Sequence, residues 1–286
     1  MWFTNFLNVV LSGMLRGAEV VAQPMSSYNN QLGVIRSCEG LTKVAKQGAQ
    51  IFHQYPKFEA AERACKVIAA PDEILTEGKN FLTWFEFFVR FKTLSQLRDA
   101  TWQKRVSRIA QIFQKALETF VILPTKWGFI AIWEGLENYK FAKEIFSGLA
   151  SLFGAIAYQQ EIPHLDRKIA KWEQIEAARA THNSAATRLE KNVEQYAWEF
   201  AAYKLHNFRL AKDAALRARD FNWAKVSALP VAICDHFGFK GYLGVELLRL
   251  FSGLAITAFG FRRSLGMYQG RPKTAPTLIL AEDEPS

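Results

Sequence analysis

The stretch that decides the fold is YLGVELLRLFSGLAITAFGF, residues 242–261, which Arg262 and Arg263 follow directly. Its twenty residues are mostly apolar, and a helix needs roughly 20 such residues to cross a bilayer. Glu246 and Arg249 are three residues apart, so they share one helix face and can form an ion pair. We expect a membrane-anchoring helix with the two arginines at its interfacial end. The alternative is a buried helix at the end of a soluble bundle.

Small residues recur along two apolar segments at the spacing of a single helix face. One face belongs to the C-terminal helix and the other to residues 145–158, which are too few for a confident membrane span. Such faces allow close helix–helix approach in lipid, so we expect them to let copies of the chain assemble. The predicted packing residues are Ser147, Ser151, Ala155, Ser252, Ala255 and Ala258.

The bulk composition favours a folded protein with an anionic partner. The chain has 286 residues, of which half are hydrophobic and 22% are charged, and this composition excludes general disorder. A net charge of +9 predicts affinity for acidic lipid or for nucleic acid. The 23 Phe and eight Trp favour lipid, because interfacial anchoring uses bulky aromatic residues beside Lys and Arg. We therefore expect anionic membrane lipid as the partner and no nucleic acid.

Residues 99–120 predict the cleanest amphipathic helix, with apolar residues at alternating spacings of four and three. A basic polar face opposite Trp, Phe and Ile is typical of a helix in a lipid interface, although a helix on a protein core has the same stripe. The predicted membrane-inserting residues are Trp102, Val106, Ile109, Phe113 and Phe120. The predicted contacts to acidic lipid are Lys104, Arg105, Arg108, Lys115, Arg262 and Arg263.

The chain divides into five predicted segments. We expect residues 1–24 to be a leader, an extension upstream of a start at Met25 or an interfacial helix, and residues 25–158 to form amphipathic and apolar helices. Pro163 opens the most polar part, and residues 159–225 predict long polar helices that form a hairpin or an oligomerisation arm. Residues 226–263 are the membrane-anchoring segment, and residues 264–286 predict a disordered tail.

No pattern of catalytic or metal-binding residues stands out. The three cysteines lie far apart along the chain, and the five histidines form no dense set of metal ligands. Cys234, Asp235 and His236 are adjacent, but neighbours in sequence cannot supply nucleophile–base geometry without a third orienting group. We therefore expect a protein that is not an enzyme and needs no cofactor or metal.

Three stretches follow a layout that is known from one family. Each begins with a glycine or a Cys-Asp step and leads through basic or small residues into an aromatic or apolar helix. The residues are Gly40, Lys43, Lys46, Phe52 and Tyr55, then Gly78, Lys79, Phe81 and Leu82, then Cys234, Asp235, Gly241, Gly244, Ser252, Gly253, Arg262 and Arg263. In this layout the chain resembles the peroxin-eleven family of peroxisomal membrane-elongating proteins. The resemblance implies a place in the peroxisomal membrane, proliferation of that organelle and recruitment of its fission machinery.

The expected fold is all-α, with amphipathic helices and an apolar C-terminal helix that make a membrane-associated protein. The expected mechanism is wedge insertion, in which the helix over residues 99–120 buries its apolar face roughly 5–10 Å into one leaflet. The alternative function is that of a soluble helical-bundle scaffold, whose Phe-rich segments form the core and whose polar helices bind a protein partner.

Overall fold

The computed structural model describes residues 29–54, 86–88, 90, 91, 97, 100–129, 131, 133, 135–179 and 188–269. These residues are almost entirely helical and contain no strand, which confirms the all-α prediction. The predictions for residues 1–24, for the Gly78–Lys79 step and for the chain after Gln269 lie outside the described residues.

Eight helical elements follow one another along the described chain. They are α2 (Asn29–Gln54), α4 (Trp102–Leu117), the π-helical turn η2 (Glu118–Ile122), α5 (Leu123–Lys126), α6 (Leu136–Arg179), α7 (Arg188–Val226), α8 (Leu229–His236) and α9 (Leu243–Gln269). Thr101 sets the start of α4, because its hydroxyl accepts the backbone N–H of Lys104. The apolar C-terminal helix is present as predicted, and it continues past Arg263 into the segment that was expected to be disordered.

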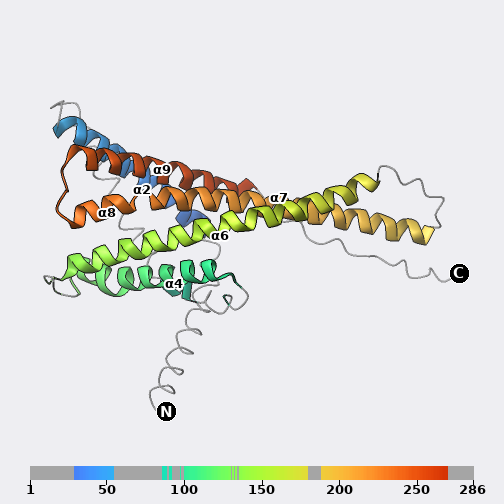
Figure 1. Ribbon diagram of the computed structural model, residues 1–286, viewed down its shortest axis with the longest axis horizontal. Coiled ribbons are helices and arrows are strands. Elements are labelled where there is room, and N and C mark those ends of the chain that lie inside the picture. Colours follow the sequence, from blue (N-terminus) through green and yellow to red (C-terminus); the bar gives the residue numbers. More distant parts are fainter. Residues whose placement is uncertain are drawn as a thin grey trace, which may run out of the picture.

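The long helices α6 and α7 form an antiparallel hairpin that runs the length of the molecule (Figure 1). At one end α4 lies along α6, and α2 and α9 lie on the other side, so a helical body surrounds this half of the hairpin. The other half projects from the body as a two-helix arm. We refer below to these two parts as the body and the arm.

Helix α6 is continuous through Pro163. A proline removes one helix hydrogen bond and usually kinks or ends a helix. Here Ile162 and Leu165 flank the proline and pack with Ala215 of α7 in a buried apolar cluster. Packing against α7 on both sides of the proline holds the two halves of α6 in one helix.

Helices α2 and α9 pack antiparallel through glycines. A Cβ atom added at Gly40 would lie 2.6 Å from the hydroxyl oxygen of Thr257, and one added at Gly253 would lie 3.1 Å from Val44. Both approaches are tighter than ordinary van der Waals contact, so a side chain at Gly40 would require the Thr257 side chain to move. Such close approach is how helices associate when small residues line their interface.

Candidate membrane-facing surface and basic pocket

Helix α9 presents several large apolar side chains to the outside of the molecule, among them Leu243, Phe251 and Leu254. Residues Leu243–Ser264 form the one helical stretch in the described part of the chain that is long and apolar enough to cross a membrane, with a mean hydropathy of 1.5. Only 11% of its most apolar window is buried. A core helix of a soluble bundle is usually mostly buried, so the exposure of α9 favours a helix that meets lipid. This helix supports the association of the chain with a membrane.

Three charged side chains hold the beginning of α9 to its neighbours. Arg249 donates to the carboxylates of Glu246 and Asp235, and Gln47 of α2 donates to Glu246 at 3.3 Å. The pair between Glu246 and Arg249 confirms the prediction from their spacing. The charges are thus satisfied within the chain, as charged groups near lipid need to be.

Helix α4 is turned with its apolar face outward and its polar face inward. Trp102 is 60% exposed and Phe113 is 53% exposed, whereas Gln103, Ser107 and Lys115 are buried. An amphipathic helix of a water-soluble protein has the opposite orientation, with its apolar stripe in the core. Of the five predicted membrane-inserting residues, Trp102, Ile109, Phe113 and Phe120 are exposed and Val106 is half-buried.

Small residues on α6 explain why the polar face of α4 turns inward. The hydroxyl of Ser107 donates to the carbonyl of Ala150 at 2.6 Å. A Cβ atom at Gly154 would lie 3.1 Å from the Ser107 hydroxyl and 2.8 Å from the side-chain nitrogen of Asn222. The narrow face of α6 therefore receives short polar side chains from α4 and α7, which leaves the bulky residues of α4 on the outside.

The predicted packing residues on α6 are used inside this chain. The hydroxyl of Ser151 donates to the carbonyl of Ser147 at 2.8 Å, and Ala155 is fully buried. On α9 the hydroxyl of Ser252 donates to the carbonyl of Ser227 at 2.9 Å. Ala255 is half-buried and Ala258 is exposed, so Ala258 alone of the six predicted packing residues presents itself fully to an outside partner.

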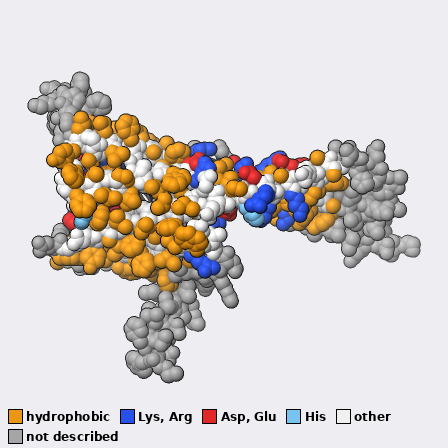
Figure 2. Space-filling view, viewed as in Figure 1, with side chains coloured by type: hydrophobic (Ala, Val, Ile, Leu, Met, Phe, Trp, Pro, Cys, Tyr) orange, Lys and Arg blue, Asp and Glu red, His pale blue; other side chains and the backbone are white. Residues whose placement is uncertain are grey.

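Aromatic and apolar side chains cover the end of the body that lies away from the arm. Figure 2 shows hydrophobic side chains across the body and charged ones gathered toward the arm. The exposed aromatic residues of the two end loops and their flanks are Phe129, Trp133, Tyr139, Phe237, Phe239 and Tyr242. Along α9, Tyr242 and Arg262 are twenty residues apart, which corresponds to about 30 Å of helix and to the thickness of the hydrocarbon core.

Lys115 was predicted to contact acidic lipid, but the structure places it inside the body. Its ammonium group lies 2.8 Å from Glu86 and 2.6 Å from Glu118, and its side chain is only 8% exposed. Glu86 also accepts the guanidinium of Arg90 at 2.6 Å. Lys115 is therefore part of a buried charge network that joins α4 to residues 86–91, and lipid headgroups cannot reach it.

The other predicted lipid-contacting cations lie where the body meets the arm. Lys104 pairs with Glu161 at 2.8 Å, and Arg262 pairs with Asp220 at 3.1 Å. The guanidinium of Arg105 donates to the carbonyl of Ala100 at 2.9 Å, and that of Arg108 donates to Gln111 at 3.3 Å. Arg263 stacks its guanidinium 5.2 Å from the ring centre of Phe221. Lys104 and Arg263 lie at the level where the apolar helix ends, and Arg108 lies deeper in the body, next to Ser107, which contacts Ala150.

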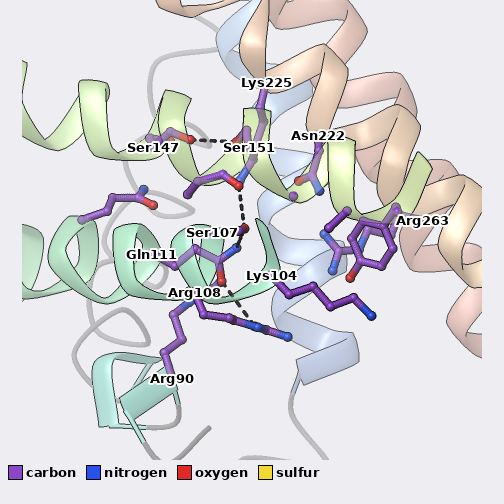
Figure 3. A pocket seen from close by; sticks show the side chains of 15 residues that line it. Arg90, Lys104, Ser107, Arg108, Gln111, Ser147, Ser151, Asn222, Lys225 and Arg263 are labelled. Atoms are coloured by element: carbon purple, nitrogen blue, oxygen red, sulfur yellow. Dashed lines mark hydrogen bonds between the residues drawn. The ribbon is translucent and has the colours of Figure 1, made fainter. Parts of the chain in front are cut away.

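A pocket opens at this level between α4, α6, α7 and α9 (Figure 3). Its volume is about 190 Å³. Its fifteen lining residues include five cations and no carboxylate, with Ser, Gln and Asn side chains between them. The cations are Arg90, Lys104, Arg108, Lys225 and Arg263. Sequence reasoning singled out three of them as surface contacts but did not find the pocket, because its residues come from distant parts of the chain.

Of the adjacent Cys234, Asp235 and His236, the last two make side-chain contacts within the body. Asp235 accepts from Arg249, and the His236 ring stacks on Phe141 with 3.9 Å between the ring centres. In the described ranges, no group of three or more His, Cys, Asp or Glu residues could hold a metal ion.

Comparison with known proteins gives no assignment for this chain. No family model, no curated protein and no solved structure matches it.

Proposed function

We propose that this chain is a non-enzymatic membrane protein whose helical body lies in the bilayer and shapes it. The inverted orientation of α4 carries the proposal: Trp102 and Phe113 face outward while Lys115 is buried with its carboxylate partners. Outward apolar and inward paired polar groups suit a protein surrounded by lipid, because lipid tails solvate the first and cannot solvate the second.

The dimensions of the body support the same proposal. Along α6, Tyr139 and Tyr158 are 19 residues apart, which corresponds to about 28 Å of helix. The Tyr242–Arg262 separation on α9 gives about the same length, so each helix carries interfacial side chains about one hydrocarbon thickness apart. The arm, with exposed ion pairs such as Lys212 with Asp166, then lies in water outside the headgroups.

The proposed mechanism is a wedge that α6 holds in place. Helix α4 lies antiparallel along α6, with Trp102 against Phe153 and Phe113 against Phe146. Its outward apolar face displaces lipid beside α6, and we propose that this displacement is larger in one leaflet than in the other and so favours curvature. As the resemblance implies, the outcome would be elongation and proliferation of peroxisomes, with assembly of copies of the chain and recruitment of the fission machinery.

The test is reconstitution of the full chain into vesicles that contain anionic lipid, followed by electron microscopy of vesicle shape. The unaltered chain should turn round vesicles into tubules. Phe113→Glu should reduce tubulation at least tenfold, because a charge at a lipid-facing position costs about 2.5 to 3.5 kcal/mol. Gln160→Glu adds the same charge at an exposed polar position of α6 and should tubulate like the unaltered chain.

Two results would contradict the proposal. Equal tubulation by Phe113→Glu and by the unaltered chain would remove α4 from the mechanism. An unaltered chain that stays dispersed without detergent and does not bind vesicles would favour the soluble scaffold instead.

A further inference from the structure

The pocket between α4, α6, α7 and α9 has an excess of positive charge on its walls. Five of its lining side chains are cationic and none is acidic. The carboxylates that pair with two of these cations, Glu161 with Lys104 and Glu86 with Arg90, are not among the lining residues. Like charges around one cavity repel each other, and an anion inside the cavity relieves this repulsion.

The size of the pocket restricts what it can hold. A volume of about 190 Å³ is far above the roughly 10–15 Å³ that a single water needs, and it is below the roughly 300 Å³ at which drug-sized ligand sites begin. Uncharged hydrogen-bonding side chains, including Asn222 and Gln111, lie between the cations. The pocket therefore fits a small, highly charged oxyanion, and Arg and Lys are the side chains that proteins use to bind phosphate.

The cations reach the pocket from three directions. The side chains of Lys104 and Arg108 leave α4 and run the same way along one side, with Arg263 of α9 near the end of Lys104 (Figure 3). Lys225 enters from α7 on the opposite side. Lys225 and Arg263 also lie on the same aromatic ring, 4.8 Å and 5.2 Å from the centre of Phe221. Phe221 thus helps to position both side chains at the pocket.

The pocket lies at the end of the apolar span of α9. Arg263 precedes Ser264, the last residue of that span, and it lines the pocket. If α9 crosses the bilayer, the headgroup region begins at this residue. The phosphate groups of lipids in the surrounding leaflet are then at the level of Arg263 and Lys104, on one side of the pocket.

We infer that this pocket binds the phosphomonoester headgroup of an anionic phospholipid, with the phosphate held by Lys104, Arg108, Lys225 and Arg263. A monoester carries up to two negative charges near neutral pH, so it compensates a cationic pocket better than a phosphodiester does. The claim that the phosphate belongs to a lipid rests on the proposed membrane function. The claim that the pocket binds a phosphate group does not.

The test measures binding by the purified full chain in a neutral detergent. The probes are dioctanoyl phosphatidic acid, dioctanoyl phosphatidylcholine and inorganic phosphate. Phosphatidic acid should bind saturably and at least tenfold more tightly than either of the other two. The adjacent arginines of α9 supply matched variants, since Arg263 lines the pocket and Arg262, which is 59% exposed and pairs with Asp220, does not.

Arg263→Gln should weaken the binding of phosphatidic acid at least tenfold, whereas Arg262→Gln should change it less than twofold. A second pair of variants repeats the comparison on α4, in case Arg263→Gln fails to fold. Lys104→Gln should weaken the binding of phosphatidic acid, and Arg105→Gln at the neighbouring exposed position should not. Circular dichroism and thermal unfolding without lipid show that each variant is folded. Equal losses within both pairs would mean that surface charge binds the lipid, and the pocket would be rejected.

The remaining outcomes separate this inference from the proposed function. Inorganic phosphate that binds as tightly as phosphatidic acid would overturn the lipid source and leave a soluble phosphate as the ligand. Absence of saturable binding by all three probes would overturn the pocket itself. Alkaline carbonate extraction of the same chain tests the membrane function: a chain that washes off but still binds phosphatidic acid through Arg263 would reject the proposed function and retain the pocket.

Discussion

Replacing Lys115 by Met should lower the free energy of unfolding by about 3 to 5 kcal/mol. Lys115 lies between Glu86 and Glu118, and the three side chains are 8%, 8% and 13% exposed. Methionine has a similar length and fills the same space, so the loss comes from the charge alone. Without the ammonium group, two nearby carboxylates stay buried without their shared counter-charge, and their repulsion adds to the cost of burial.

Urea or thermal unfolding of the full chain in a mild detergent, followed by circular dichroism, measures this loss. The matched control is Lys140→Met on α6, where Lys140 pairs with Glu137 at 2.6 Å and both side chains are largely exposed. An exposed pair contributes less than about 1 kcal/mol, so this variant should unfold almost like the unaltered chain. Equal small effects of the two substitutions would contradict the inward orientation of the polar face of α4.

Placing arginine at both Phe251 and Leu254 should release the chain from membranes. Both residues are exposed near the middle of the apolar span, Phe251 at 63% and Leu254 at 44%. An arginine at the centre of a membrane helix costs about 3 kcal/mol on insertion scales, so the pair costs about 6 kcal/mol. Most of the unaltered chain should stay in the pellet after alkaline carbonate washing, and most of the double variant should appear in the supernatant.

The control for this variant adds the same two charges to the arm. Ala177 of α6 and Ala214 of α7 are exposed in the polar hairpin, so the variant with Ala177→Arg and Ala214→Arg should remain in the pellet. Equal retention of the two double variants in the membrane would show that the outer face of α9 does not meet lipid.

The sequence alone is sufficient to predict the apolar C-terminal helix and one of its ion pairs. A long, mostly apolar run is a signal that is local to the helix itself, and a spacing of three residues places Glu246 and Arg249 on one face whatever surrounds them. The start of α4 is similarly local, because Thr101 caps the helix with its own hydroxyl.

The direction in which α4 turns could not be read from its own residues. The stripe of Trp102, Ile109 and Phe113 has the same spacing whether it faces a protein core or lipid. The choice depends on α6, where the small face at Ala150 and Gly154 accepts Ser107. For the same reason Lys115 was placed at the membrane surface, since its partner Glu86 lies in a different part of the chain.

The pocket could not be predicted either, because the residues that line it are even farther apart in the sequence. Arg90, Lys104, Lys225 and Arg263 are separated by long stretches of sequence and meet only through the packing of four helices and the segment before α4. Polar residues that line a site on several helices do not form a sequence motif, so only the assembled body shows that their charges share one cavity.

The most direct test of the account is the depth of the body in a bilayer. A nitroxide label is attached at position 254, 262 or 177 in a chain whose three cysteines are replaced by alanine, and each labelled chain is reconstituted into vesicles. Collision rates with oxygen, which concentrates in lipid, and with a water-soluble nickel complex then report depth. We predict that the label at 254 meets oxygen and not nickel, that the label at 262 lies at the headgroups, and that the label at 177 lies in water. A label at 254 that collides freely with nickel would contradict a body that lies in the membrane.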